Sequence, residues 1–514
     1  MPLAMKLAVL IAVFVLGCSG EADSNATLPL PSGDAGASSD ATDAADMFAP
    51  DNGAAPDAGT PLAYQQGLTV TYYSQYRDAV LTRVEPAIDH VWGDQSPAAE
   101  VPADFFSARW SGEIFAPESG TYAFWASTDD GMRIWIDGAS VIDAWVWQFP
   151  TRYESTVQLT QGWHTIQVEY MERDLTAEAR VGWSGPGVED QVLSGEFLRT
   201  TGLPSDLGAP QSPYLNPVLP NDCPDPGVAK DEETDTYYAI CTGGNFWIWR
   251  SYDLVFWHGT FANVLPDGKP SWAANGGRNW APEIHKVGNK WNVYYTSVNG
   301  ANVLSIGVAS ADNPLGPYVD RGGPLVEHPQ GVIDPHFFED SDGRRFLTYK
   351  IDGNSVGQPT PIFIRELTAN GLDFAPGSSQ VEILRNNAAT WEGGVVEGQW
   401  IVKHDNFYYM FYSGNVYDNR YRTGVARSTS LTGPYEKFPS PILANNARWV
   451  GPGHGSVVEV GGDSVFVYHA WPALPGGGND TTKGRNILVD RIRWEGGWPK
   501  ISDGTPSVTP QPAF

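Results

Sequence analysis

Residues 396–413 read VEGQWIVKHDNFYYMFYS, which is a strand, a short polar turn and an aromatic second strand. The same hairpin pattern recurs four more times, with the second strands TYYAI, WNVYYT, RFLTYK and SVFVYHA. The turn centres lie near residues 233, 289, 342, 405 and 462, about 57 residues apart. A repeat of this length, with further strands between the hairpins, is typical of a four-stranded propeller blade. The pattern therefore predicts an all-β chain with a five-bladed β-propeller over residues 215–505.

The charge of the chain excludes several kinds of partner. Its 514 residues include 32 Lys and Arg against 60 Asp and Glu, a formal net charge of −28. Such a surface repels phosphate backbones and anionic lipid, so we expect no nucleic-acid partner and no direct membrane binding. A neutral oligosaccharide or polysaccharide stays compatible with this charge. Three cysteines are too few for a disulfide-dense scaffold or a multi-cysteine metal site.

The N-terminus has the pattern of an export signal. Lys6 precedes the apolar run 7–16, which is too short to span a bilayer but suits a signal peptide. Residues 15–18, Val-Leu-Gly-Cys, resemble a bacterial lipobox, which implies lipidation of Cys18 and an exported cell-envelope lipoprotein. The alternative is an ordinary secretory signal and a secreted protein. Residues 19–62 are acidic and poor in apolar residues, which predicts a disordered tether.

A second β domain is predicted at residues 66–200, followed by a Pro/Gly-rich linker at 201–214. Short strands alternate between apolar and polar residues, which predicts a β-sandwich. SARWSGEIFAPESGTYAFWASTDDGMRIWIDG (107–138) and GWHTIQVEYME (162–172) resemble the protective-antigen-type domain of toxins, adhesins and glycosidases. The resemblance implies that Asp129 and Asp130 hold a calcium ion that binds sugar hydroxyls. The alternative is that Asp129-Asp130-Gly131 is a tight turn.

Five residues mark the starts of the first strands of the hairpins: Asp225, Glu283, Asp334, Glu397 and His454. Because the innermost strand of each blade runs along the propeller axis, we expect these side chains to meet at one mouth of the channel. Crowded carboxylates raise one another's pKa values, which is typical of a catalytic site. The alternative is that each residue caps only its own strand.

The motifs around these residues resemble glycoside hydrolase family 43, inverting five-bladed propeller enzymes that act on arabinose- and xylose-containing polymers. They are CPDPGVA (223–229), NWAPEIHK (279–286), GVIDPHFFEDSDG (331–343), VVEGQWIVK (395–403) and GPGHGSVVE (451–459). The resemblance implies that Asp225 is the general base, Asp334 the pKa modulator and Glu397 the general acid. It implies a calcium ion near His454, while the chemistry itself requires no cofactor. Gln399 departs from the Pro of many relatives, and Glu392 is a rival acid.

Three aromatic residues are candidates for stacking on sugar rings: Trp280, and Phe246 or Trp247; packing between blades is the alternative. Glu283 is a further candidate for substrate binding. Cys223 and Cys241 flank the first hairpin turn almost symmetrically, which predicts a disulfide in an oxidising compartment. The predicted function is an α-L-arabinofuranosidase or β-xylosidase, with endo-1,5-α-L-arabinanase as the alternative. A non-catalytic glycan-binding lipoprotein is the alternative of another class.

Overall fold

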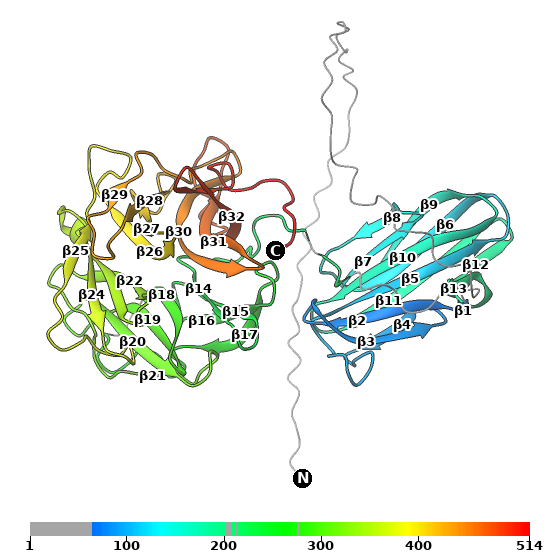
Figure 1. Cartoon of the computed structure of the whole chain (residues 1–514), viewed down its shortest axis with the longest axis horizontal. Coiled ribbons are helices and arrows are strands. Elements are labelled where there is room, and N and C mark those ends of the chain that lie inside the picture. The colour runs from blue at the N-terminus through cyan, green and yellow to red at the C-terminus, as the bar shows by residue number, and fades with distance from the viewer. Residues whose placement is uncertain (1–63, 201–207, 212, 275–277) are drawn as a thin grey trace, which may run out of the picture. The chain divides into compact units, whose positions relative to one another are not determined.

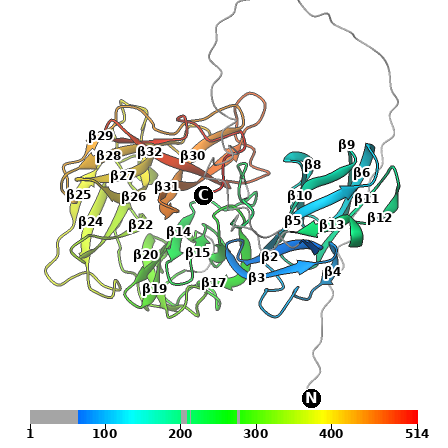
Figure 2. The same cartoon turned by 45° about the vertical axis from the view of Figure 1, so that its right-hand side comes forward.

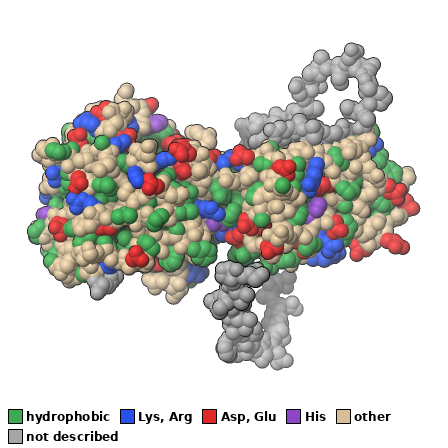
Figure 3. Space-filling view, turned by 90° about the horizontal axis from the view of Figure 1, so that it is seen from below, with side chains coloured by type: hydrophobic (Ala, Val, Ile, Leu, Met, Phe, Trp, Pro, Cys, Tyr) green, Lys and Arg blue, Asp and Glu red, His purple; other side chains and the backbone are tan. Residues whose placement is uncertain are grey.

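The computed structural model describes residues 64–200, 208–211, 213–274 and 278–514. The predicted signal peptide, the lipidated Cys18 and the tether lie outside the described residues, as does most of the predicted linker. Within the part that is described, the chain forms no helix with the length and apolarity that crossing a membrane requires. On the face seen in Figure 3, Lys and Arg side chains are scattered among acidic and uncharged ones.

The first domain contains two antiparallel sheets, as expected for a β-sandwich (Figures 1 and 2). The larger sheet has the order β1-β13-β5-β10-β7-β8, with β2 on β5 and β3 on β2; the smaller has the order β12-β11-β6-β9, with β4 on β11. The larger sheet comprises β1 (Gln65–Gln66), β2 (Leu68–Ser74), β3 (Asp78–Glu85), β5 (Phe106–Ala116), β7 (Gly131–Ile136), β8 (Ala139–Ala144), β10 (Gly162–Glu172) and β13 (Leu198–Thr200). The smaller comprises β4 (Asp89–Gly93), β6 (Gly120–Asp129), β9 (Thr151–Leu159), β11 (Ala177–Gly185) and β12 (Val188–Val192), and a short 3-10 turn, η1 (Gly195–Phe197), precedes β13.

One apolar cluster holds the first domain together. In β6 the side chains of Tyr122, Phe124 and Ala126 are fully buried, while those of the residues between them are partly exposed. Trp110 and Trp183 are the largest side chains in the cluster. Because successive side chains of a strand point to opposite faces, this alternation places one face of each sheet in a shared core.

The second domain is a five-bladed propeller (Figure 1). Each blade is a four-stranded antiparallel sheet whose strands pair in chain order. The blades are β14 (Gly227–Asp231), β15 (Thr236–Ile240), β16 (Trp247–Ser251) and β17 (His258–Asn263); β18 (Trp280–Val287), β19 (Lys290–Val298), β20 (Leu304–Ala311) and β21 (Val319–Asp320); β22 (Val332–Glu339), β23 (Arg345–Ile351), β24 (Ile362–Leu367) and β25 (Val381–Leu384); β26 (Val396–His404), β27 (Phe407–Gly414), β28 (Arg422–Ser428) and β29 (Glu436–Lys437); β30 (Trp449–Val460), β31 (Asp463–Pro472), β32 (Asn486–Glu495) and β33 (Trp498–Ile501). A short 3-10 turn, η2 (Gly353–Val356), follows β23.

The ring is closed by packing between neighbouring blades. Five main apolar clusters each draw residues from two adjacent blades, and one of them joins the fifth blade to the first. The first strands β14, β18, β22, β26 and β30 lie nearest the centre of the ring in Figure 1, and each contacts the first strands of both neighbouring blades. The site described below is built on these five strands and the loops that precede them.

Candidate active site

A repeated backbone feature lies near the start of each innermost strand. Asp225, Ala281, Asp334, Gly398 and His454 all have positive φ, between 42° and 59°. In β18, β22, β26 and β30 the pairing register shifts at this point, as in a β-bulge, and Asp225 lies just before β14. We call these five residues the bulge row. Bulges re-aim side chains, and positive φ at non-glycine residues is concentrated at functional sites.

The bulge row corrects the predicted alignment of the five blades. Ala281, not Glu283, occupies the position in the second blade, and Glu283 lies two residues deeper along β18. Gly398 occupies the position in the fourth blade, so Glu397 precedes it by one residue. The sequence-based alignment counted residues back from each hairpin turn. It missed these one- and two-residue offsets because a bulge adds residues to one strand and leaves the turn unchanged.

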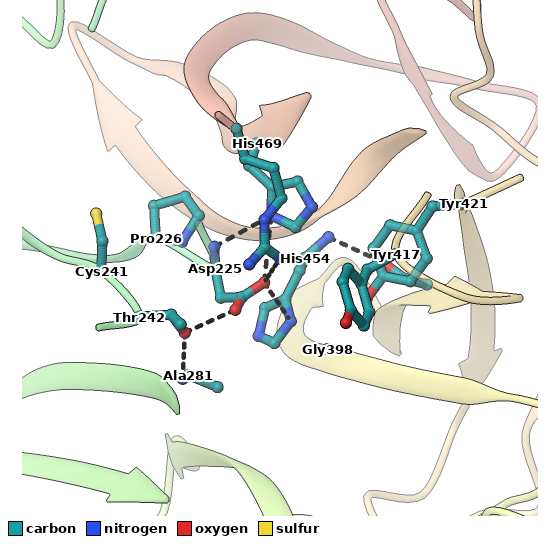
Figure 4. A network of polar contacts seen from close by, with 12 residues as sticks. Asp225, Pro226, Cys241, Thr242, Ala281, Gly398, Tyr417, Tyr421, His454 and His469 are labelled. Atoms are coloured by element: carbon teal, nitrogen blue, oxygen red, sulfur yellow. Dashed lines mark hydrogen bonds and ion pairs between the residues drawn. The ribbon is translucent and has the colours of Figure 1, made fainter. Parts of the chain in front are cut away.

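Asp225 is surrounded by hydrogen-bond donors and cations (Figure 4). Its Oδ1 lies 3.0 Å from Arg485 Nη1 and 3.3 Å from Nδ1 of both His454 and His469. Its Oδ2 accepts a hydrogen bond from the Thr242 hydroxyl at 2.6 Å. Burial works to raise its pKa, but Arg485 and the two histidines outweigh burial and hold the pKa well below its usual value. Asp225 is therefore an ionised carboxylate, the form that a general base needs.

Asp334 has the opposite electrostatics. It is buried, and its Oδ2 accepts a hydrogen bond from the backbone N–H of Gly398 at 2.9 Å. Burial raises its pKa to about 7, and the negative charges of Glu397 and Asp225 add to that rise, against the opposing effect of His454. Gln399 donates a side-chain hydrogen bond to the Asp334 carbonyl. Gln399 thus fixes the backbone of Asp334.

Glu397 is held at both carboxyl oxygens. The Tyr421 hydroxyl donates to Oε1 at 3.0 Å, and the Lys350 ammonium donates to Oε2 at 2.8 Å. Lys350 is fully buried and also lies 3.1 Å from Asp352 Oδ1. The rival acid Glu392 is used elsewhere, since its carboxylate accepts from Tyr412 at 2.7 Å and from Lys437 at 2.8 Å and does not line the cavity described next.

The three predicted catalytic carboxyl groups line one cavity of about 260 Å³. Trp280 and Tyr417 line it as well, and the Tyr417 side chain is 60% exposed. The Tyr417 ring lies 5.3 Å from the Arg485 guanidinium, and its carbonyl accepts from Trp471 Nε1 at 2.9 Å. A cavity that combines carboxyl groups with aromatic walls suits a sugar ring, which presents hydroxyls at its edge and C–H groups on its faces.

Three candidate substrate-binding residues lie outside this cavity. Phe246 is fully buried and packs on Tyr295 at 5.4 Å between the first two blades, so it is a core residue and no sugar platform. Trp247 is 52% exposed but does not line the cavity. Glu283 is buried and does not line the cavity; its Oε2 lies 2.9 Å from His336 Nδ1 and 2.8 Å from His285 Nε2.

The cluster of Glu283, His285 and His336 has the composition of a metal site, but its hydrogen bonds argue against one. His336 Nε2 accepts the backbone N–H of Ile401 at 2.9 Å, so the neutral ring carries its proton on Nδ1 and donates it to Glu283. Burial lowers the pKa of His336 to about 3, which keeps the ring neutral. His336 therefore ties β18 to β26 through β22.

The residues present do not fit a calcium ion at His454. Burial works to lower the pKa of His454, but the carboxylates of Asp225, Asp334 and Glu397 outweigh it and raise the pKa, which favours a protonated ring. Calcium takes oxygen ligands, and a protonated imidazole offers none. Among the described residues, His454 belongs to no group of three converging metal ligands. No catalytic step is assigned to a metal at this position.

The first domain has an acidic cluster of its own. Asp129, Asp130 and Glu172 converge with ligand atoms within 4.8 Å of one another, and all three are buried. Burial, and then the neighbouring negative charges, raise the pKa of Asp130 to about 7 and that of Glu172 to about 10. Glu172 Oε1 has no hydrogen-bond partner. Asp129 and Asp130 do connect β6 to β7. A tight turn, however, does not require three buried carboxyl groups, one of which has an oxygen without a hydrogen-bond donor.

The structure joins Cys223 and Cys241 in the predicted disulfide, with their Cα atoms 5.1 Å apart. Lys350, Tyr421, Arg485 and His469 were not among the predicted site residues. Lys350 had a usable signal, since it is a lysine among aromatic and aliphatic residues in RFLTYK. His469 had a similar signal, since it lies in SVFVYHA on the second strand of the fifth blade, whereas Tyr421 and Arg485 lie in loops whose sequence carries no comparable signal.

Comparison with known protein families agrees with these two domains. The model described as "Glycosyl hydrolases family 43" matches residues 214–499, and the PA14 domain model matches residues 64–195. The chain is 32% identical over 148 residues to the anti-sigma-I factor RsgI3 of Acetivibrio thermocellus, which is 28% of this chain and 22% of that protein.

The chain is similar to proteins of several named activities. It is 26% identical to the extracellular exo-alpha-(1->5)-L-arabinofuranosidase ArbA of Cellvibrio japonicus, over 53% of this chain and 84% of that protein. It is 29% identical to the beta-D-galactofuranosidase xynD of Aspergillus niger, over 56% and 88%. A crystal structure of a thermostable family-43 glycoside hydrolase superposes with a TM-score of 0.51 at 30% identity, covering 58% of this chain and 99% of that one.

Proposed function

Because this chain belongs to family 43 of the glycosyl hydrolases, we propose that its propeller catalyses inverting hydrolysis of arabinose- or xylose-containing polysaccharide, as an α-L-arabinofuranosidase or β-xylosidase. The observation that carries the proposal is the pairing of unlike carboxyl groups in one cavity. Asp225 is held ionised by cations, whereas Asp334, beside Glu397, retains a proton to about neutral pH. Carboxyl groups whose environments push their pKa values apart take different roles in acid–base chemistry.

The environment of Asp225 suits a general base, and the resemblance to family 43 supports Glu397 as the general acid. Asp225 takes a proton from a water molecule as the water oxygen attacks the anomeric carbon. Glu397 gives its proton to the glycosidic oxygen as the bond from the anomeric carbon to that oxygen breaks. Asp334 keeps its proton to about neutral pH because of its burial, and it orients the strand of Glu397 by accepting the N–H of Gly398. A glycan-binding protein without catalysis has no need of this division of roles.

The test is hydrolysis of a panel of aryl α-L-arabinofuranosides, β-D-xylosides and β-D-galactofuranosides, together with debranched arabinan. Proton NMR of the first-formed sugar is expected to show the anomer opposite to that of the substrate. Retention of configuration would remove Asp225 from its role as base. Release of long oligosaccharides from arabinan, with no activity on the aryl glycosides, would instead identify an endo-arabinanase. The matched control for a Glu397→Gln variant is Glu392→Gln, which should keep its activity. Glu392 is also a buried carboxylate, but it lies outside the cavity.

We also propose that the first domain binds glycan through a calcium ion held by Asp129 and Asp130, with Glu172 as a third ligand. The buried, converging carboxyl groups and the partnerless Glu172 Oε1 support this. A cavity of about 160 Å³ next to Asp129 is lined by Trp147 and Phe149, which are 53% and 73% exposed and could stack on a sugar. Titration calorimetry should detect calcium binding that Asp130→Ala abolishes and Asp143→Ala, at an exposed position on β8, leaves intact.

Export as a lipoprotein is proposed from residues 15–18 and from relatives named as extracellular enzymes. Cells that express the chain and are fed a labelled fatty acid should incorporate label into the protein. Cys18→Ser should abolish labelling. Labelling that persists in Cys18→Ser would contradict the proposal, and a secreted, unlabelled protein would favour the ordinary signal.

A further inference from the structure

Lys350 is a buried cation whose position calls for an explanation. It lies on β23, the second strand of the third blade, and none of its side chain is exposed. Burying an ammonium group costs several kcal/mol unless partners replace its water. Its partners are Glu397 Oε2 at 2.8 Å and Asp352 Oδ1 at 3.1 Å. The fold therefore places a buried positive charge in direct contact with the carboxyl group assigned as general acid.

The two oxygens of Glu397 face different kinds of donor. An ammonium group has only protons to donate, so the oxygen that it contacts must accept. A tyrosine hydroxyl can donate or accept, so the oxygen next to Tyr421 can carry a proton of its own. The acid form of Glu397 thus has one favourable arrangement, with Oε2 accepting from Lys350 and the acidic proton on Oε1 beside Tyr421.

The reaction leaves a negative charge on Glu397. As the proton moves to the glycosidic oxygen, the carboxyl group becomes a carboxylate with an ammonium group already 2.8 Å from one oxygen. A preplaced cation stabilises charge that develops in the transition state. In general, a positive charge next to a carboxyl group favours the ionised form of that group over the acid form.

We propose, on the basis of the proposed function, that Lys350 is the positioning residue of the general acid: it places the acidic proton on Glu397 Oε1 and sets the upper pH limit of catalysis. The charged and titratable groups around this pair are Asp352, Asp334, Tyr421, His454 and Asp225. Burial opposes the charge on Lys350, but the carboxylates of Glu397, Asp352 and Asp334 outweigh it and raise the pKa of Lys350, so it stays cationic wherever the enzyme is active.

The test is the pH profile of kcat/KM for Lys350→Met. Removing the cation is expected to move the alkaline limb up by about one to three pH units. On the acidic plateau, turnover of substrates with alkyl leaving groups should fall about tenfold or more, while substrates with activated phenolate leaving groups change little. The matched control is Lys403→Met, which removes the Lys403–Asp340 ion pair from β26 and should leave the limb in place.

A second variant moves the limb in the opposite direction. Asp352→Asn removes a negative charge that offsets Lys350, so the alkaline limb should move to lower pH. This variant keeps Lys350 and tests the proposal if Lys350→Met fails to fold. The proposal would be overturned if the alkaline limb stayed in place in either folded variant. In that case activity would be lower by the same factor at every pH and for both kinds of leaving group. An inactive wild-type chain would refute the proposed function instead, so the two failures are distinct.

Discussion

The hydroxyl of Thr242 donates a hydrogen bond to Asp225 Oδ2 at 2.6 Å and accepts the backbone N–H of Ala281 at 2.7 Å. The contact links Asp225, the proposed general base in the first blade, to Ala281, the bulge-row residue of the second blade (Figure 4). In the fifth blade, Arg485 contacts the other oxygen at 3.0 Å and His469 Nδ1 accepts the Asp225 backbone N–H at 3.1 Å, so Asp225 is oriented from both neighbouring sides. The predictions below follow from this and the related contacts.

Asp225→Asn should lower kcat by about 10²–10⁴-fold, because water then attacks without a base. Substrates with activated leaving groups should not rescue it, since deprotonation of water is still required. Binding of a product sugar, measured by calorimetry, should persist. Rescue by an activated leaving group would show that Asp225 is not the base.

Glu397→Gln should cause a loss of similar size for substrates with poor leaving groups, because the amide has no acidic proton to give. An activated phenolate departs without protonation, so a 2,4-dinitrophenyl glycoside should restore most of the rate. Kinetics of one aryl series on both variants measures the contrast. Equal losses across the series would remove Glu397 from the role of acid.

Arg485→Met should move the acidic limb of the kcat/KM profile to higher pH. Arg485 is the leading charge that keeps the pKa of Asp225 well below its usual value, so without it Asp225 takes up a proton at higher pH. The matched control is Arg420→Met, since Arg420 forms an exposed ion pair with Asp418. An acidic limb that stays in place in Arg485→Met would show that another group titrates there.

Replacing both Cys223 and Cys241 by serine should lower the free energy of unfolding by about 3 kcal/mol, because the disulfide closes a loop with a sequence separation of 18. Denaturant unfolding measures the change. Mass spectrometry after alkylation without reductant should find both thiols of the wild-type protein protected. Two alkylated thiols would contradict the disulfide.

Local patterns in the chain were enough for the fold. The recurring turns and aromatic strands predicted five blades, because strand alternation and turn residues act over a few neighbouring positions. The repeated Asp-Pro pairs at Asp225 and Asp334 likewise predicted two members of the site. Glu397 was also found, although its place in the bulge row was wrong by one residue.

The sequence by itself therefore determined the all-β class, the number of blades and the three carboxyl groups that line the cavity. Only the tertiary structure decided which charges act on those groups. Lys350, Tyr421 and Arg485 contact these carboxyl groups from other strands and loops. Phe246 and Glu283 are buried and do not line the cavity. The physical reason is that a carboxyl group's proton affinity depends on neighbours a few ångströms away in space, and closing the ring brings together residues that are far apart along the chain.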